Sequence, residues 1–159
     1  MKITELINEN LITLKLNSTN KKDVIRELAT YLDKADKITD LDTYVEAIEE
    51  REAQGSTGVG YGVAIPHAKS ESVKSPALVF GKTDTPLNYE SSDNDDADLF
   101  FMIAAPKGGE NLHLQTLAKL SRKLIHEEFR EELRQASTKK AIMDVLNKID
   151  GKEDSQRKS

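Results

Sequence analysis

The feature that most constrains the fold of this chain is an uninterrupted apolar segment, Leu99–Ala105. A strand with one solvated face alternates apolar and polar side chains, whereas a strand buried on both faces is apolar along its whole length. Ala77–Phe80 and Val63–Ile65 are two shorter segments with the same property. We therefore predict a central sheet with helices packed on both of its faces, which is an α/β fold.

Several other stretches show the spacing of apolar residues that is typical of helices, and each follows a residue that can cap a helix. Asn20, Asp40 and Asn111 precede three of these stretches. The last helix is expected to begin after a cap at Ser137 and to stop at Gly151, because glycine commonly ends helices.

Length and composition are those of one globular domain. The chain has 159 residues, of which 37% are hydrophobic and 32% are charged, so it is too apolar to stay unfolded. We expect a single domain over residues 1–150. Residues 151–159 are mostly polar or charged, and they are expected to form a flexible tail or the start of an interdomain linker.

Charge and composition also exclude several classes of function. The formal net charge is −5 and the lysines are interleaved with acidic residues, so no basic stripe is available for nucleic acid. No apolar run reaches the ~18–20 residues of a spanning helix. No signal-peptide core follows Met1, so we expect a cytoplasmic protein without direct membrane insertion. Without cysteine, the chain has neither a thiolate nucleophile nor a cysteine metal site.

His67 is the strongest candidate for chemistry among the three histidines. It follows Pro66, which cannot donate a hydrogen bond within a sheet, so His67 should lie at a strand end. The glycine-rich segment before it contains Ser56, Thr57 and Gly58. Backbone N–H groups of such a loop, together with hydroxyl donors, can bind an anion. The pattern predicts a phosphate-binding loop beside a neutral imidazole, which is a nucleophile toward phosphorus.

Two further residues could assist at such a site. His113 falls in the first turn of the helix expected after Asn111. A helix N-terminus favours anions and disfavours a protonated imidazole, so it would keep this ring neutral and able to donate one hydrogen bond. Arg51, at the end of the helix that follows Asp40, could hold phosphoryl oxygens with its planar guanidinium.

Each of these features has an ordinary structural explanation when it is taken alone. A glycine-rich stretch is more often a turn than a phosphate site, and Arg51 alone is a solvated residue at a helix end. His126 has no such neighbours in the sequence and is expected to be structural. The chain contains no P-loop, no dinucleotide fingerprint and no zinc-ligand spacing. A phosphoryl group would therefore have to arrive from another protein.

The combination of two segments resembles a known family. Gly62–His67, preceded by Arg51 and the loop of residues 56–58, is similar to the phosphorylation site of the fructose/mannitol class of enzyme IIA. These proteins are phosphoryl carriers of the bacterial phosphoenolpyruvate-dependent sugar phosphotransferase system. Ala97–Pro106 followed by His113–Leu120 is similar to that family as well, and the resemblance extends over residues 3–150.

The resemblance implies a phosphotransferase component with a mixed central sheet flanked by helices. It implies that His67 accepts a phosphoryl group from the phosphocarrier protein HPr, as a tele-phosphohistidine, and passes it to a cysteine of a IIB domain. A membrane IIC domain would then transport the sugar, with fructose as the expected one. His113 would assist by hydrogen bonding and Arg51 would stabilise phosphoryl charge, with no metal or other cofactor. Because these 159 residues include no cysteine, the acceptor lies in another protein or in a longer native chain.

Two other functions stay open on the residues alone. Nitrogen-related regulatory IIA proteins share the fold and the phosphorylated histidine but control partner proteins, although the loop Lys107-Gly108-Gly109 favours the fructose transport class. A small anion-binding or hydrolytic domain would instead depend on Ser56 or Thr57. The reactive imidazole nitrogen, the sugar and the oligomeric state also stay open. The His67 side chain is expected to be partly exposed.

Overall fold

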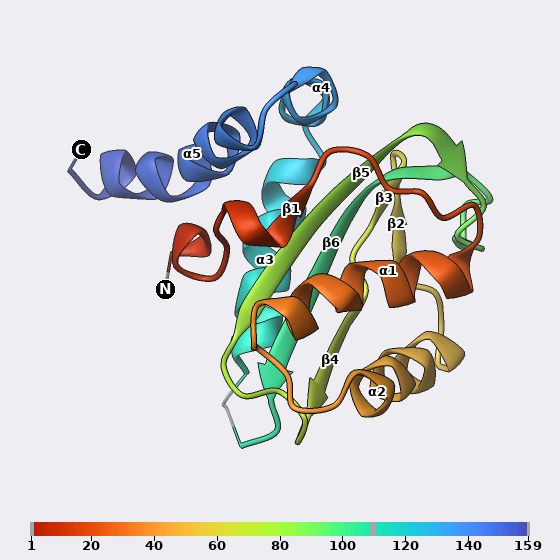
Figure 1. Ribbon diagram of the computed structural model, residues 1–159. Coiled ribbons are helices and arrows are strands. Elements are labelled where there is room, and N and C mark those ends of the chain that lie inside the picture. The colour runs from red at the N-terminus through yellow and green to blue at the C-terminus, as the bar shows by residue number, and fades with distance from the viewer. Residues whose placement is uncertain (1, 109–110, 159) are drawn as a thin grey trace.

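The computed structural model describes residues 2–108 and 111–158 and shows an α/β fold (Figure 1). The strands are β1 (Ile12–Thr13), β2 (Gly58–Gly60), β3 (Val63–Ala64), β4 (His67–Ser70), β5 (Ala77–Leu87) and β6 (Ala97–Pro106). The α-helices are α1 (Lys21–Lys34), α2 (Leu41–Ala53), α3 (Leu112–Leu124), α4 (Glu127–Gln135) and α5 (Lys139–Lys158). Two short 3-10 helices, Ile3–Glu5 and Glu9–Leu11, precede β1.

The sheet is mixed, with β5 and β6 at its centre. These two strands are antiparallel, and Leu78 pairs with Ile103. β1 is parallel to β5, β3 and β4 are both parallel to β6, and β2 lies beyond β3. The apolar segment Leu99–Ala105 forms the middle of β6, and every one of its residues is buried. The α/β fold predicted from this segment is therefore confirmed.

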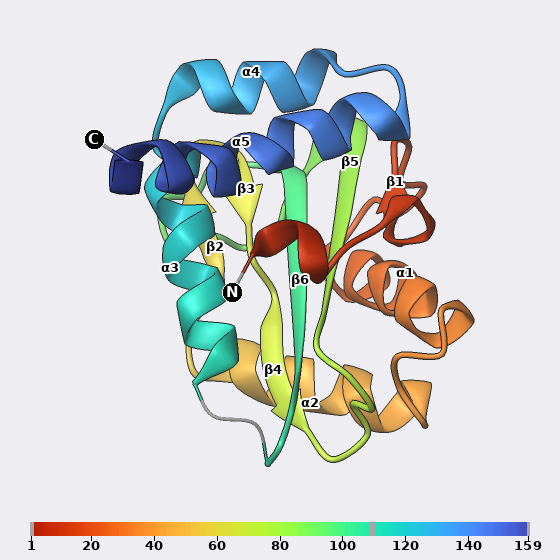
Figure 2. The ribbon, with the colours of Figure 1, turned by 90° about the vertical axis from the view of Figure 1, so that its left-hand side faces the viewer.

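Helices cover both faces of the sheet, as predicted. α1 and α2 lie on one face, and α3 and α5 lie on the other (Figure 2). The caps predicted for α1 and α2 are confirmed: Asn20 Oδ1 accepts the Asp23 N–H at 2.9 Å, and Asp40 Oδ2 accepts the Thr43 N–H at 3.2 Å. α2 was expected to end close to Arg51, and it ends two residues later, at Ala53.

The last helix departs from the prediction at both ends. Thr138, rather than Ser137, caps it, because the Thr138 hydroxyl accepts the Ala141 N–H at 3.0 Å. The helix also continues through Gly151 to Lys158, so the predicted stop at Gly151 is wrong. Glycine ends a helix where it adopts a left-handed conformation, and elsewhere it only weakens the helix.

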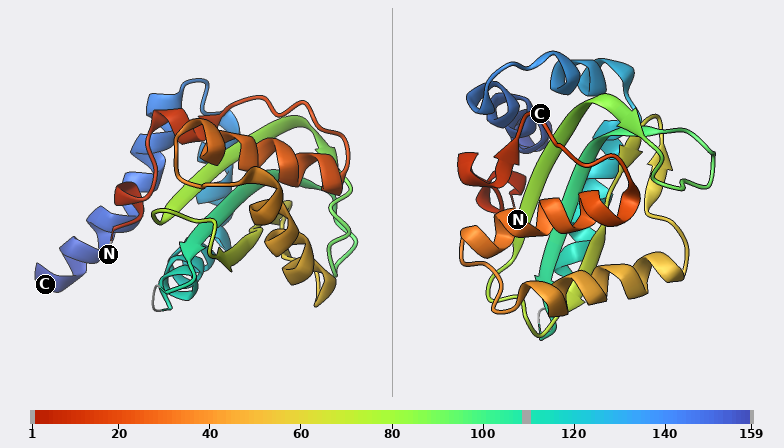
Figure 3. Two further views of the ribbon diagram at one scale, coloured as in Figure 1. Left: turned by 60° about the horizontal axis from the view of Figure 1, so that its bottom comes forward. Right: turned by 45° about the vertical axis from the view of Figure 1, so that its right-hand side comes forward.

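Asp150 of α5 ties the two ends of the chain together. This carboxylate is buried; Oδ1 accepts the Ile3 N–H at 2.9 Å, and Oδ2 accepts the Thr4 N–H at 3.1 Å. The N-terminal segment consequently runs alongside α5 (Figure 3). Ser159 of the predicted tail and Gly109 of the predicted loop lie outside the described residues. None of the described helices combines the length and the apolar character that crossing a bilayer requires.

The glycine-rich segment forms a tight hairpin between β2 and β3. Its turn contains Tyr61 with φ +61° and Gly62 with φ +79°, and two successive left-handed residues are typical of a type I′ turn. A Cβ atom at Gly62 would lie 2.8 Å from side-chain atoms of both Arg134 and Asp98. Glycine is therefore required here for its conformation and for its lack of a side chain.

Candidate active site

His67 is the first residue of β4, directly after the break that Pro66 makes in the strand. It pairs with Ile103 of β6, and the Tyr44 hydroxyl of α2 donates to the Ile103 carbonyl at 3.1 Å. We expected from the sequence that the His67 side chain would be partly exposed. This expectation is wrong: the residue is buried and only 7% exposed. β4, which begins at His67, packs against both α2 and α3.

One hydrogen bond determines which imidazole nitrogen of His67 is available. Nδ1 lies 2.7 Å from the Ile65 carbonyl oxygen. A carbonyl can only accept, so Nδ1 must carry the proton of the neutral ring and Nε2 must carry the lone pair. Pro66 lies between the two residues. The Ile65 N–H donates to the Thr57 carbonyl at 3.0 Å.

The surroundings of His67 favour the neutral ring. Burial lowers the pKa of His67 below its ordinary value, and the positive charge of Arg51 lowers this pKa further. The hydrogen bond to Ile65 and the charge of Glu52 act in the opposite direction but do not reverse the shift. Because the ordinary histidine pKa is about 6.5, His67 is neutral at pH 7 and can act as a nucleophile.

His113 lies in the first turn of α3, as predicted, and its ring faces the same region. Its centroid is 6.3 Å from that of His67. Burial lowers the pKa of His113, and charge on His67 and Lys69 lowers it further. Its Nδ1 is buried without a hydrogen-bond partner among the described residues. A buried ring nitrogen without a partner has hydrogen-bonding capacity that a ligand could use.

Arg51 lies in the last turn of α2 and is half-buried. Its Nη1 donates to the Gly55 carbonyl at 2.9 Å, which orients the guanidinium. A guanidinium carries five N–H donors, so this bond leaves others for an anion. The positive charge of Arg51 also lowers the pKa of His67, after the larger effect of burial. The fold thus brings Arg51, His67 and His113 together from three separate elements.

The predicted phosphate-binding loop makes hydrogen bonds within the protein. Thr57 is buried, and both its N–H and its hydroxyl donate to the carboxylate of Glu52. The Ser56 hydroxyl accepts the Gly58 N–H at 3.1 Å. A Cβ atom at Gly58 would lie 1.9 Å from the Ser91 hydroxyl, so this glycine is needed for close packing. Sequence reasoning missed Glu52, whose link to Thr57 spans five residues and belongs to no local motif.

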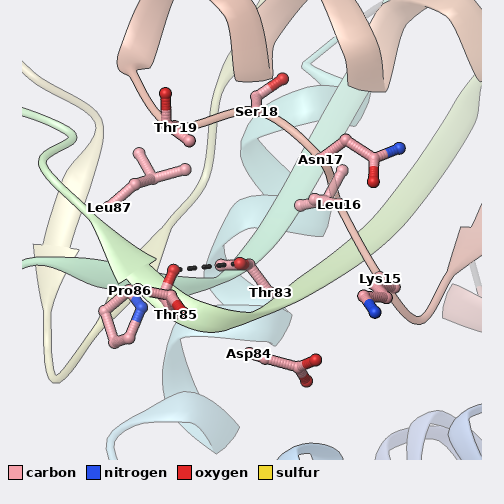
Figure 4. Close-up of a pocket in the computed structure, with 10 residues that line it drawn as sticks. All are labelled: Lys15, Leu16, Asn17, Ser18, Thr19, Thr83, Asp84, Thr85, Pro86 and Leu87. Carbon is pink, nitrogen blue, oxygen red and sulfur yellow. Dashed lines mark hydrogen bonds between the residues drawn. The ribbon is translucent and has the colours of Figure 1, made fainter.

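A separate pocket of about 310 Å³ lies between the segment before α1 and the second half of β5 (Figure 4). Its lining contains none of the candidate site residues, and its only titratable side chains are Lys15 and Asp84. The Thr83 hydroxyl donates to the Thr85 carbonyl at 3.0 Å. Hydroxyls without a neighbouring base make a poor nucleophilic site, so we place the candidate active site at His67.

Comparison with known proteins identifies the family of this chain. The family model for EIIA 2 of the phosphoenolpyruvate-dependent sugar phosphotransferase system matches residues 5–149. The chain belongs to this family. As an EIIA 2 domain of the fructose/mannitol class, it is a phosphotransferase component.

Two relatives of this EIIA domain are fructose-specific. The fructose-specific EIIABC component of Bacillus subtilis (strain 168) is 49% identical over 150 residues, which are 94% of this chain and 24% of that protein. The chain therefore spans about a quarter of the length of that relative. The fructose-specific EIIA component of Haloferax volcanii is 37% identical over 139 residues, covering 87% of this chain and 90% of that one.

Solved structures share the fold of this EIIA domain. The nitrogen regulatory protein IIA-Ntr from Neisseria meningitidis has a TM-score of 0.85 at 29% identity and covers 91% of this chain and 98% of that one. A complex of enzyme IIAMTL with phosphorylated enzyme IIBMTL from Escherichia coli has a TM-score of 0.77 at 23% identity. It covers 89% of this chain and 96% of that one.

Proposed function

We propose that this EIIA domain carries a phosphoryl group on Nε2 of His67, taking it from HPr and passing it to a cysteine of a IIB domain. The hydrogen bond from Nδ1 to the Ile65 carbonyl supports this proposal most directly, because it leaves Nε2 as the nucleophilic nitrogen. The name EIIABC of the Bacillus subtilis relative supports a IIB partner and a membrane IIC partner, on the same native polypeptide or on separate ones. A cytoplasmic location stays a prediction.

In the proposed transfer, the Nε2 lone pair attacks phosphorus as the bond from phosphorus to the histidine nitrogen of HPr breaks. The HPr imidazole leaves with the bonding electron pair, and no metal is required because the donor is already activated. The transition state spreads negative charge over the three equatorial oxygens. Fixed donors aimed at those oxygens stabilise this charge without reorganising. Arg51 and His113 are the proposed donors, and the loop of Ser56, Thr57 and Gly58 shapes the surrounding backbone.

His113→Ala is expected to slow phosphoryl uptake by roughly tenfold to a hundredfold, because one hydrogen bond to a charged group contributes roughly 1.5–3 kcal/mol. The acceptor His67 stays in place, so the final extent of labelling should not change. Rapid-quench kinetics with phospho-HPr measure the rate. His126→Ala is the matched control, because His126 is an exposed histidine at the N-terminus of α4. Equal rates for both variants and the wild type would remove His113 from the site.

We propose fructose as the transported sugar, because both relatives named above are fructose-specific. The regulatory alternative is supported by the fold shared with IIA-Ntr.

The donor and the acceptor distinguish transport from regulation. We expect the phosphorylated protein to lose its phosphoryl group within seconds to a fructose-specific IIB domain, and the IIB cysteine to gain it. The measurement is intact mass of both proteins after mixing. If the protein is labelled only by the nitrogen-branch phosphocarrier and no fructose-specific IIB domain discharges it, the regulatory function is the correct one.

A further inference from the structure

The carboxylate of Glu52 is the most completely surrounded charged group beside the site. It lies next to Arg51 in the last turn of α2, and its side chain is only 6% exposed. Oε1 accepts the Thr57 N–H at 3.0 Å and lies 2.9 Å from Lys21 Nζ. Oε2 accepts the hydroxyls of Thr57 and of Tyr89, the latter at 3.0 Å. A buried carboxylate held by four groups is rigid as well as satisfied.

Lys21 balances the charge of this carboxylate. Its ammonium pairs with Glu52 and also lies 4.7 Å from the centre of the Tyr89 ring. The Lys21 side chain is 15% exposed, so the ion pair is shielded from solvent. Glu52 can act on His67 through the groups that its hydrogen bonds hold in place and through its charge, which raises the pKa of His67.

A continuous series of hydrogen bonds connects Glu52 to His67. Glu52 accepts hydrogen bonds from the N–H and the hydroxyl of Thr57. The Thr57 carbonyl accepts the Ile65 N–H at 3.0 Å, and the Ile65 carbonyl accepts the His67 Nδ1–H at 2.7 Å. The N–H and the carbonyl of Ile65 flank one α-carbon. A shift of Thr57 would therefore move the acceptor that orients the imidazole.

We propose that Glu52 is a positioning residue for phosphoryl transfer, acting through Thr57 and Ile65 to hold His67 in the orientation and tautomer in which Nε2 carries the lone pair. This inference rests on the function proposed above, in which His67 is the acceptor. Glu52 itself does not touch the phosphoryl group. Its effect is to fix a nucleophile that must approach phosphorus in line, where small displacements are costly.

The test compares Glu52→Ala and Glu52→Gln in the full chain, with Glu49→Gln as the control for the loss of an exposed charge on the same helix. Two quantities are measured: the rate of phosphoryl uptake from phospho-HPr, and the imidazole ¹⁵N shifts of His67 in the unphosphorylated protein. Glu52→Ala is expected to slow uptake roughly tenfold to a hundredfold. Its ¹⁵N shifts should move from one fixed tautomer toward an average of two. Glu52→Gln should lie in between, because an amide oxygen can still accept the Thr57 N–H.

An unchanged rate with unchanged ¹⁵N shifts in Glu52→Ala would overturn the proposal. A slower rate with unchanged shifts would overturn it too, since the imidazole would then be positioned without Glu52. If Glu52→Ala does not fold by circular dichroism, Glu52→Gln decides, and wild-type behaviour in both measurements counts against the proposal. Failure of the proposed function looks different: wild type and Glu49→Gln would then take up no phosphoryl group, while the ¹⁵N shifts would still report whether Glu52 acts on His67.

Discussion

Replacing His67 with asparagine is expected to reduce phosphoryl uptake to background, a loss of roughly three orders of magnitude or more, as for removal of other nucleophiles. Asparagine is chosen because its amide can donate to the Ile65 carbonyl in place of Nδ1 while offering no nucleophilic nitrogen. This variant therefore removes the chemistry and keeps the hydrogen bond. The measurement is intact mass after incubation with phosphoenolpyruvate, enzyme I and HPr.

Burial of His67 makes a control for folding necessary. His67→Ala would leave a cavity at a buried position, so a loss of labelling in that variant alone could reflect altered packing. His126→Ala, which changes an exposed histidine, should label like the wild type. Labelling of a folded His67→Asn protein at any other residue would contradict the assignment.

Arg51→Ala is expected to slow phosphoryl uptake about a hundredfold, the scale on which removal of one preorganised donor acts. Arg51→Lys should recover only part of this loss. A lysine carries the charge but cannot reproduce the planar fork that bonds the Gly55 carbonyl and still offers donors to phosphoryl oxygens. Single-turnover kinetics with phospho-HPr measure both variants.

Arg26→Ala is the matched control for Arg51, because Arg26 is a half-exposed arginine paired with Asp42 on the surface. It should transfer at the wild-type rate. Arg51→Lys at the wild-type rate would show that only a positive charge is needed. Arg51→Ala at the wild-type rate would place Arg51 outside the site altogether.

The fold could be predicted from the sequence because the central strand is recognisable from its apolar residues alone. Leu99–Ala105 carries no polar residue, and only burial on both faces accommodates such a segment. The caps at Asn20 and Asp40 were equally readable, since an N-cap bond joins residues three apart. The end of α5 was not readable at Gly151, because a glycine ends a helix only when the following chain turns away.

The residues of the candidate site were predicted from the sequence, whereas the contacts that hold them were not. His67, His113 and Arg51 follow from residue type and position, but the burial of His67 depends on how β4 packs against α2 and α3 in the folded chain. The reactive nitrogen depends on where the Ile65 carbonyl points, which only the folded backbone determines. Glu52 could not be identified from the sequence, because its partners Lys21, Thr57 and Tyr89 come from separate parts of the chain and form no local motif.

The most direct test of the central claim is to identify the atom that carries phosphorus. Long-range ¹H–¹⁵N correlation spectra of the phosphorylated, ¹⁵N-labelled protein distinguish the two nitrogens of each histidine ring. We expect phosphorus to be covalently bonded to Nε2 of His67, with Nδ1 still protonated and hydrogen-bonded to the Ile65 carbonyl. Phosphorus on Nδ1 of His67, on His113, or on a hydroxyl such as that of Thr57 would contradict it.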